Sequence, residues 1–385
     1  MLQQITNGRI LTPEGWLEGG SVIVEGGKIR EVLNTTLPVV GAEQIDARGC
    51  DIVPGGIELH IHGGGGRDFM EGTEEAFRTA IEAHMHYGTT AIYPTLSSST
   101  REQIDAAIRT CEKLMEEPGS PVMGLHLEGP YFNLNKAGAQ MPDIIRKPDP
   151  KEYKEIFAMT RCVKRWDAAP ELEGAKEFYE TCVANGCKPS IAHTDGGWED
   201  VLMAYKAGAD HATHFTNAMS SLTKAREYKK VGVVESVFAI PDFTVEVISD
   251  GIHVPPVLIK QIYYAKGVKN MCFVTDSLAC SASKSRSNFD PRVIIEDGVC
   301  KLSDRSALAG SISTMDRLVR TAVQEADIPM EDACRMISEI PARIMKIDDR
   351  KGFIKPGHDA DIIMFDKNIE VTFVMQNGQV KRNDL

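Results

Sequence analysis

The sequence lacks several features that would place it in common protein classes. No C-x-x-C pair occurs among its nine cysteines, an odd number spread from Cys50 to Cys334, so neither a disulfide framework nor a thiolate metal site is expected. It contains no uninterrupted apolar run of about eighteen residues, the length of a membrane-spanning helix. The first fifteen residues lack the basic and apolar regions of a signal peptide. We therefore expect a soluble cytoplasmic protein with reduced thiols.

An excess of positive charge is also missing. The 43 Lys and Arg residues face 55 Asp and Glu residues, and the formal net charge of -12 argues against a nucleic-acid partner or an anionic membrane. An anionic substrate must then be held by a local group of cations. The 385 residues, 42% hydrophobic and 25% charged, have the composition of a globular protein with one large core or two smaller ones.

Both ends of the chain consist of short β-branched runs separated by Gly and Asn turns. Residues 5–12 and 21–33 show this texture near the N-terminus, and residues 360–366 and 371–381 repeat it near the C-terminus. Two similar ends around a different middle predict that the termini meet in one small β-sandwich. We expect that domain to comprise residues 1–53 plus 352–385, leaving residues 54–351 as the catalytic domain.

The middle of the chain alternates candidate strands with helical patterns. Eight strands are expected at residues 55–63, 88–96, 121–130, 163–171, 187–195, 209–219, 243–251 and 270–277. No G-x-G-x-x-G turn follows an early strand, which argues against a doubly wound sheet. The pattern predicts an α/β fold of the (β/α)8 TIM-barrel type.

Residues that can bind metal lie at the ends of these expected strands, where a barrel gathers its chemistry. They are His60, His62, Glu128, His193, His214 and Asp276. Because side chains two apart on a strand share a face, the H-x-H pair of the first strand points in one direction. Four imidazoles and two carboxylates suffice for one or two divalent ions, with Zn²⁺ first and Fe, Mn, Co or Ni as alternatives. The competing interpretation is a set of polar core groups.

The other histidines show less convergence. His84 and His86 repeat the H-x-H spacing within a helical pattern, where residues two apart do not face each other, so we expect structural roles. His126 lies deeper on the third strand and is expected to support the ligands, whereas His211 has no convergent partner. His253 follows the seventh strand as either a substrate contact or an ordinary loop histidine.

The strand-end residues together resemble the amidohydrolase superfamily. The segments "GLHLEGPYFN" (124–133), "THFTNAMS" (213–220) and "LAGSISTM" (308–315) are similar to the branch that deacetylates 6-phosphorylated N-acetylhexosamines. The resemblance implies Glu128, His193 and His214 as ligands of a principal metal. It implies His60 and His62 as ligands of a second metal, and Asp276 as the catalytic residue. The substrate contacts that it implies are Ala139, Gln140, Asn217, Ala218, Arg226, His253, Leu308, Ala309 and Gly310.

The sequence departs from that pattern in two places. Gln140 stands where the family usually has a histidine that polarises the acetyl carbonyl, and an amide can donate a hydrogen bond but carries no charge. The loop around Arg226 is longer than usual, so Lys224, Lys229 and Lys230 are further candidates for the phosphate contact, unless this basic cluster is a solvated loop.

The implied reaction is metal-dependent amide hydrolysis that converts N-acetylglucosamine 6-phosphate to acetate and glucosamine 6-phosphate, in a homodimer. Asp276 would accept a proton from the attacking water and return it to the leaving amine. One alternative is another phosphorylated N-acetylhexosamine or a different amide, such as an N-acylamino acid or a cyclic amide. Many enzymes of the latter kinds use a carboxylated lysine after the fourth strand, where this chain reads "VKRWDAAPE". A binding protein that had lost its metal is disfavoured because the set of ligands is intact.

Overall fold

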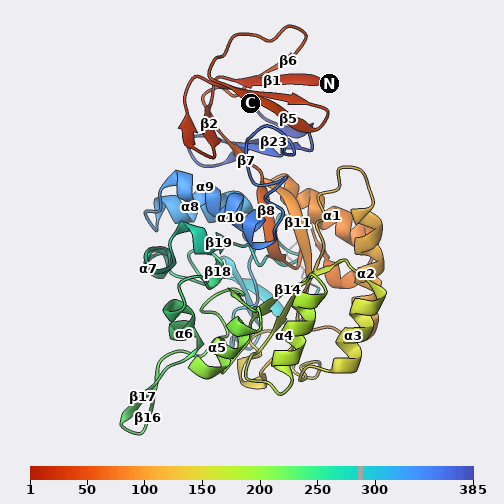
Figure 1. Ribbon diagram of the computed structural model, residues 1–385, viewed down its shortest axis with the longest axis vertical. Coiled ribbons are helices and arrows are strands. Elements are labelled where there is room, and N and C mark those ends of the chain that lie inside the picture. The colour runs from red at the N-terminus through yellow and green to blue at the C-terminus, as the bar shows by residue number, and fades with distance from the viewer. Residues whose placement is uncertain (285–288) are drawn as a thin grey trace.

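The computed structural model describes residues 1–284 and 289–385, and it places both termini in one all-β body at one end of the molecule (Figure 1). A four-stranded sheet has the order β5-β4-β1-β6, and a six-stranded sheet has the order β24-β23-β22-β7-β2-β3. Their strands are β1 (Leu2–Thr6), β2 (Arg9–Thr12), β3 (Gly15–Leu17), β4 (Ser21–Glu25), β5 (Lys28–Leu33), β6 (Glu43–Asp46), β7 (Asp51–Pro54), β22 (Ile362–Phe365), β23 (Val371–Gln376) and β24 (Gln379–Asn383).

Apolar side chains from both ends of the chain form the core of this body. Ile5 and Val22 from the first sheet cluster with Ile362 and Phe373 from the second, and all four are fully buried. The antiparallel pairing of β7 with β22 joins the two ends directly. The expected sandwich of N-terminal and C-terminal strands is therefore present.

Eight parallel strands form the second body, and each pairs with the next one along the chain, from β8 to β19. They are β8 (Gly56–Ile61), β11 (Thr89–Leu96), β12 (Leu125–Tyr131), β13 (Val163–Ala168), β14 (Lys188–Ile191), β15 (His211–Ala212), β18 (Thr244–Val247) and β19 (Met271–Phe273). Backbone hydrogen bonds connect the first strand to the last, from Asp276 N to His60 O (3.0 Å) and from His62 N to Ser277 O (2.9 Å). The predicted (β/α)8 barrel is confirmed.

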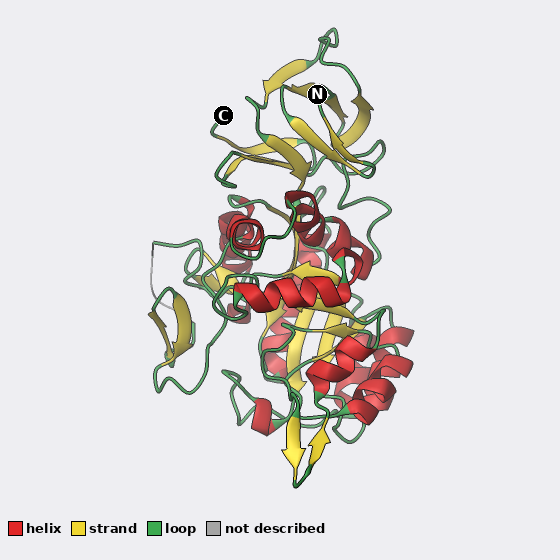
Figure 2. Cartoon of the chain, turned by 90° about the vertical axis from the view of Figure 1, so that its left-hand side faces the viewer, coloured by secondary structure: helices red, strands yellow, loops and turns green. Residues whose placement is uncertain are grey.

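Helices cover the barrel strands (Figures 1 and 2). They are α1 (Glu74–Met85), α2 (Arg101–Met115), α3 (Pro150–Met159), α4 (Ala175–Ala184), α5 (Trp198–Lys206), α6 (Val233–Ala239), α7 (Pro256–Lys266), α8 (Met315–Gln324), α9 (Met330–Ile337) and α10 (Glu339–Ile344). In α2 the Thr100 side chain caps the N-terminus, and Gln103 reaches back to the backbone of Thr100. Ile104, Ile108 and Cys111 follow at helical spacing and are buried. Local sequence and tertiary packing therefore agree.

Three hairpins among the described residues interrupt the regular alternation, the first formed by β9 (Gly63–Gly64) and β10 (Arg67–Asp68). β16 (Thr223–Ala225) pairs with β17 (Tyr228–Lys230), and this hairpin projects well beyond the rest of the barrel (Figures 1 and 2). β20 (Val293–Glu296) pairs with β21 (Val299–Leu302) after the eighth barrel strand. No helix within the described residues is long and apolar enough to span a lipid bilayer.

Candidate active site

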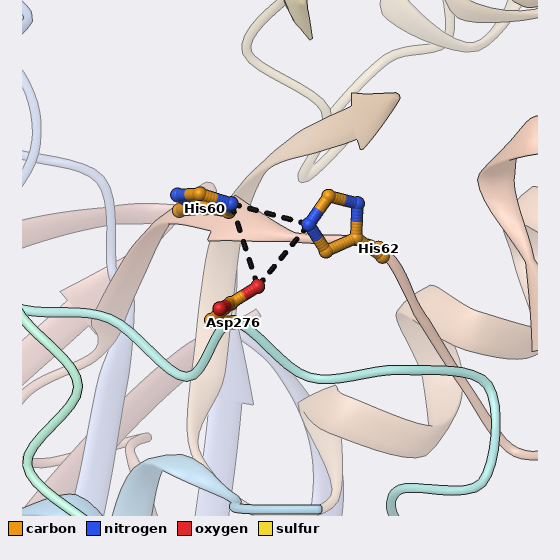
Figure 3. A group of neighbouring side chains, drawn as sticks. All are labelled: His60, His62 and Asp276. Carbon is orange, nitrogen blue, oxygen red and sulfur yellow. Dashed lines mark hydrogen bonds and ion pairs between the residues drawn. The ribbon is translucent and has the colours of Figure 1, made fainter. Parts of the chain in front are cut away.

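His60, His62 and Asp276 point toward one another where the first and last barrel strands meet (Figure 3). The Nε2 atoms of the two histidines lie 3.2 Å apart. Asp276 Oδ1 lies 3.1 Å from Nε2 of His62 and 3.5 Å from Nε2 of His60. All three side chains are buried, so the cluster is a dense group of potential ligands rather than a solvated surface patch.

Glu128, His193 and His214 form a second group beside the first. Glu128 Oε1 lies 3.1 Å from Nε2 of His193 and 3.0 Å from Nε2 of His214, and the two Nε2 atoms are 3.0 Å apart. Both histidines have positive φ, 45° and 33°, a conformation that is uncommon for non-glycine residues. The backbone just after β14 and β15 carries the two rings, and their Nε2 atoms face Glu128.

Glu128 connects the two groups. Its Oε1 atom lies 3.8 Å from Nε2 of His60, and its Oε2 atom lies 3.4 Å from Nε2 of His62. The structure therefore brings all six strand-end residues of the sequence analysis into one buried cluster, with this carboxylate between the two triads.

Hydrogen bonds at the Nδ1 atoms of His193 and His60 leave the Nε2 lone pairs of these rings available to a metal ion. His193 Nδ1 donates to the carbonyl of Lys136 at 2.7 Å, and because a carbonyl only accepts, the Nε2 lone pair of His193 faces Glu128. His60 Nδ1 lies 2.7 Å from Glu246 Oε1, which fixes the same tautomer. A tetrahedral ion with bonds of about 2.0–2.1 Å separates its ligand atoms by about 3.3 Å, close to the spacing within each triad. The residues fit a divalent cation.

Both carboxylates of the cluster are ionised at neutral pH. Burial raises the pKa of Glu128, but His60, together with the adjacent rings of His193 and His214, outweighs burial and holds that pKa well below its usual range. The pKa of Asp276 is lowered in the same way, since the charges and hydrogen bond of His60 and His62 exceed the effect of burial. Glu128 can therefore act as a ligand, and Asp276 as a base.

Glu246 and Arg165 form a buried ionic network beside His60, which was not predicted from the sequence. Glu246 on β18 receives the Nδ1 hydrogen bond of His60 through Oε1, and its Oε2 atom lies 2.5 Å from Nη1 of Arg165 on β13. His211, which had no expected partner, lies with Nε2 3.3 Å from the same oxygen. Burial raises the pKa of Glu246, but the Arg165 charge holds it well below the usual range. A glutamate between the valines of β18 was the available signal.

A second buried pair involves His126 of β12, which was expected to lie deeper than the ligands. Its Nε2 atom lies 2.9 Å from Asp167 Oδ2, and its ring packs edge-on against His60 with centroids 4.9 Å apart. His126 therefore restricts the ring of His60 through packing, while Asp167 orients His126.

A cavity of about 560 Å³ opens over the cluster. Of the expected substrate contacts, it is lined by Ala139, Gln140, Asn217, Ala218, His253, Leu308, Ala309 and Gly310. The volume suits a small organic substrate. His253 Nδ1 lies 2.8 Å from Asp250 Oδ2, so its Nε2 atom is the one left to face a ligand. Among the side chains whose contacts the structure describes, that Nε2 atom has no hydrogen-bond partner.

Arg226, the remaining expected substrate contact, lies outside this cavity. It occupies the turn of the β16–β17 hairpin with a positive φ of 57°, is exposed, and does not line the cavity of its own chain. Lys224, Lys229 and Lys230 are exposed on the same hairpin. The lysine and arginine that do line the described part of the cavity are Lys136 and Arg292.

The fold and the paired triads define a class of metal-dependent hydrolases, and comparison agrees. The Amidohydrolase family pattern matches residues 52–382, so the chain belongs to this family and hydrolyses an amide. It is 30% identical over 392 residues to the N-acetylglucosamine-6-phosphate deacetylase of Haemophilus influenzae, covering 100% of both chains. It is 27% identical over 377 residues to the N-acetylgalactosamine-6-phosphate deacetylase of Escherichia coli O157:H7, covering 97% of each. The crystal structure of N-acetylglucosamine-6-phosphate deacetylase from Pasteurella multocida superimposes with a TM-score of 0.94, 28% identity and full coverage of both chains.

Proposed function

We propose that this protein removes acetate from N-acetylglucosamine 6-phosphate and releases glucosamine 6-phosphate. The observation that carries the proposal is the convergence of the Glu128 and Asp276 triads beneath one cavity of about 560 Å³. The full-length similarity to deacetylases of amino-sugar phosphates supplies the substrate class.

Glu128, His193 and His214 would hold the principal ion, and His60 with His62 a second one. Imidazole and carboxylate ligands suit Zn²⁺ best, followed by Fe, Mn, Co and Ni. An ion bound there would lower the pKa of its bound water to about 7 and would polarise the acetyl carbonyl.

Asp276 acts as the general base and then as the general acid. Its ionised carboxylate accepts the proton of the attacking water at Oδ1 and returns it to the amine nitrogen as the C–N bond breaks. The side chain is buried and faces both His60 and His62, so the proton stays within the site between the two steps.

The cavity walls orient the substrate. Leu308, Ala309 and Gly310 form the side expected to surround the acetyl group, and Asn217 with His253 lies on the side expected to contact the sugar phosphate. Arg226 does not line the cavity of its own chain. We infer a homodimer in which the projecting hairpin delivers Arg226 to the cavity of the partner, where its fork binds two phosphate oxygens.

A galacto epimer is the second candidate substrate, because the similarity to the N-acetylgalactosamine-6-phosphate deacetylase also extends over nearly the whole chain. Acetate release is measured for the metal-loaded enzyme with the 6-phosphates of N-acetylglucosamine, N-acetylgalactosamine and N-acetylmannosamine, and with unphosphorylated N-acetylglucosamine. The proposal expects the highest kcat/KM for N-acetylglucosamine 6-phosphate. No release from any phosphorylated sugar would refute it.

A further inference from the structure

The side-chain amide of Gln140 is held at both ends. Its Oε1 atom accepts a hydrogen bond from the backbone N–H of Ser98 at 2.8 Å, and its Nε2 atom donates to Glu128 Oε2 at 2.7 Å. Only 8% of Gln140 is exposed. The Ser98 contact fixes which end of the amide carries the donor, because a backbone N–H can only donate.

The two carboxylate oxygens of Glu128 have different neighbours. Oε1 lies about equally far from His193 and His214, at 3.1 Å and 3.0 Å. Oε2 accepts the hydrogen bond from Gln140 and also lies 3.4 Å from Nε2 of His62. The carboxylate plane is therefore fixed by a neutral donor on one oxygen, and the other oxygen stays aimed at the two histidines.

The segment that carries Gln140 also orients a second ligand. The Lys136 carbonyl accepts from His193 Nδ1, and the Gln140 backbone N–H closes a turn onto the carbonyl of Ala137 at 3.0 Å. Gly138 in this turn has a φ of 58°, so the tight path favours glycine. Residues 136–140 thus touch two of the three members of the Glu128 triad from outside.

We propose that Gln140 is a positioning residue that acts through Glu128 on metal binding, rather than on the acetyl carbonyl. The proposal rests on the metal-dependent function proposed above. An uncharged amide suits this position, because it satisfies a buried carboxylate oxygen without placing a second cation beside the ion. Outer contacts of this kind typically change metal affinity by about 10–100-fold.

The test replaces Gln140 with Met, which keeps the length of the side chain and removes the donor. Zn²⁺ affinity is measured on metal-free protein by competition with a chromophoric chelator, without substrate, so the result stands whether or not the sugar phosphate is hydrolysed. We expect affinity for the first ion to fall by about 10–100-fold. At saturating Zn²⁺, the loss of kcat should be smaller than the loss at limiting Zn²⁺, because added metal refills the weakened site.

Two further variants distinguish the loss of the Gln140 donor from a general disturbance of the loop. Gln140→His restores an N–H donor at the same position and should recover most of the affinity, which a misfolded loop would not do. Leu134→Ala changes an exposed side chain of the same segment and should leave the affinity unchanged. Unchanged affinity in Gln140→Met, with kcat reduced about 10²–10³-fold at saturating metal, would overturn the proposal and assign the amide to the oxyanion instead.

Discussion

His60 Nδ1 donates to Glu246 Oε1 at 2.7 Å, and the other oxygen of that carboxylate is paired with Arg165. All three side chains are completely buried. One carboxylate therefore fixes the tautomer of a metal-facing histidine and also neutralises the guanidinium in the middle of the barrel.

Replacing Glu246 with Gln should destabilise the protein and loosen His60. The substitution removes the nearer of the two buried carboxylates paired with Arg165 and leaves Asp167 Oδ1 at 3.6 Å from Nε, and breaking such pairs typically costs about 3–5 kcal/mol. Urea denaturation of the metal-free protein measures the change in free energy of unfolding. The matched control, Glu82→Gln, alters an exposed residue of α1 and should leave stability within about 0.5 kcal/mol. Equal stabilities for the two variants would mean that the network contributes little.

The double variant His60→Asn, His62→Asn should bind one ion instead of two. It removes two of the three side chains of the Asp276 triad and leaves Glu128, His193 and His214 unchanged. Inductively coupled plasma mass spectrometry of reconstituted protein gives the stoichiometry. If wild type and variant bind the same number of ions, the H-x-H pair holds none.

His84 should make the protein less stable in acid. It is buried with Nε2 directed at the Gly63 carbonyl (3.0 Å), and burial lowers its pKa from 6.5 to about 4, with the hydrogen bond to Gly63 opposing that shift. The unfolded chain therefore binds a proton more readily than the folded one between these values. The His84 contribution to stability is intact above pH 6.5 and falls as the pH drops toward 4.

The measurement compares His84→Gln, which keeps an N–H donor but does not titrate, with wild type. Between pH 7 and pH 4.5 the wild type should lose about 2 kcal/mol more unfolding free energy than the variant. His86→Gln, at an exposed position two residues along the chain, is the control and should behave like wild type. Parallel pH profiles for all three proteins would contradict the assignment.

Arg226→Ala should lower kcat/KM for the phosphorylated substrate by about 10–100-fold, since a charge-assisted hydrogen bond is worth about 1.5–3 kcal/mol. Lys206→Ala, outside the hairpin, should have no such effect. Mixing Arg226→Ala subunits with Asp276→Asn subunits tests the dimer. If the hairpin serves its partner, hybrids regain one intact site and activity returns, whereas no recovery would place the arginine in its own subunit or outside the site.

Sequence reasoning predicted the barrel and the metal-capable cluster because both follow from local rules. Side chains two apart on β8 share a face, and the ends of parallel strands meet at one rim, which places His60, His62 and Asp276 together. The pairing of Arg165 with Glu246 joins residues 81 apart through the barrel interior, and no local pattern specifies it. The direction in which the exposed Arg226 hairpin projects is likewise not specified by a local pattern.

The measurement that tests the central claim most directly is acetate release from N-acetylglucosamine 6-phosphate by wild type and Asp276→Asn, both loaded to equal metal content. Asparagine keeps the shape of the side chain but cannot accept the proton of the attacking water. The account predicts turnover by wild type. In the variant, with its metal retained, kcat should fall by about 10²–10⁴-fold. Comparable rates in the two proteins would contradict it.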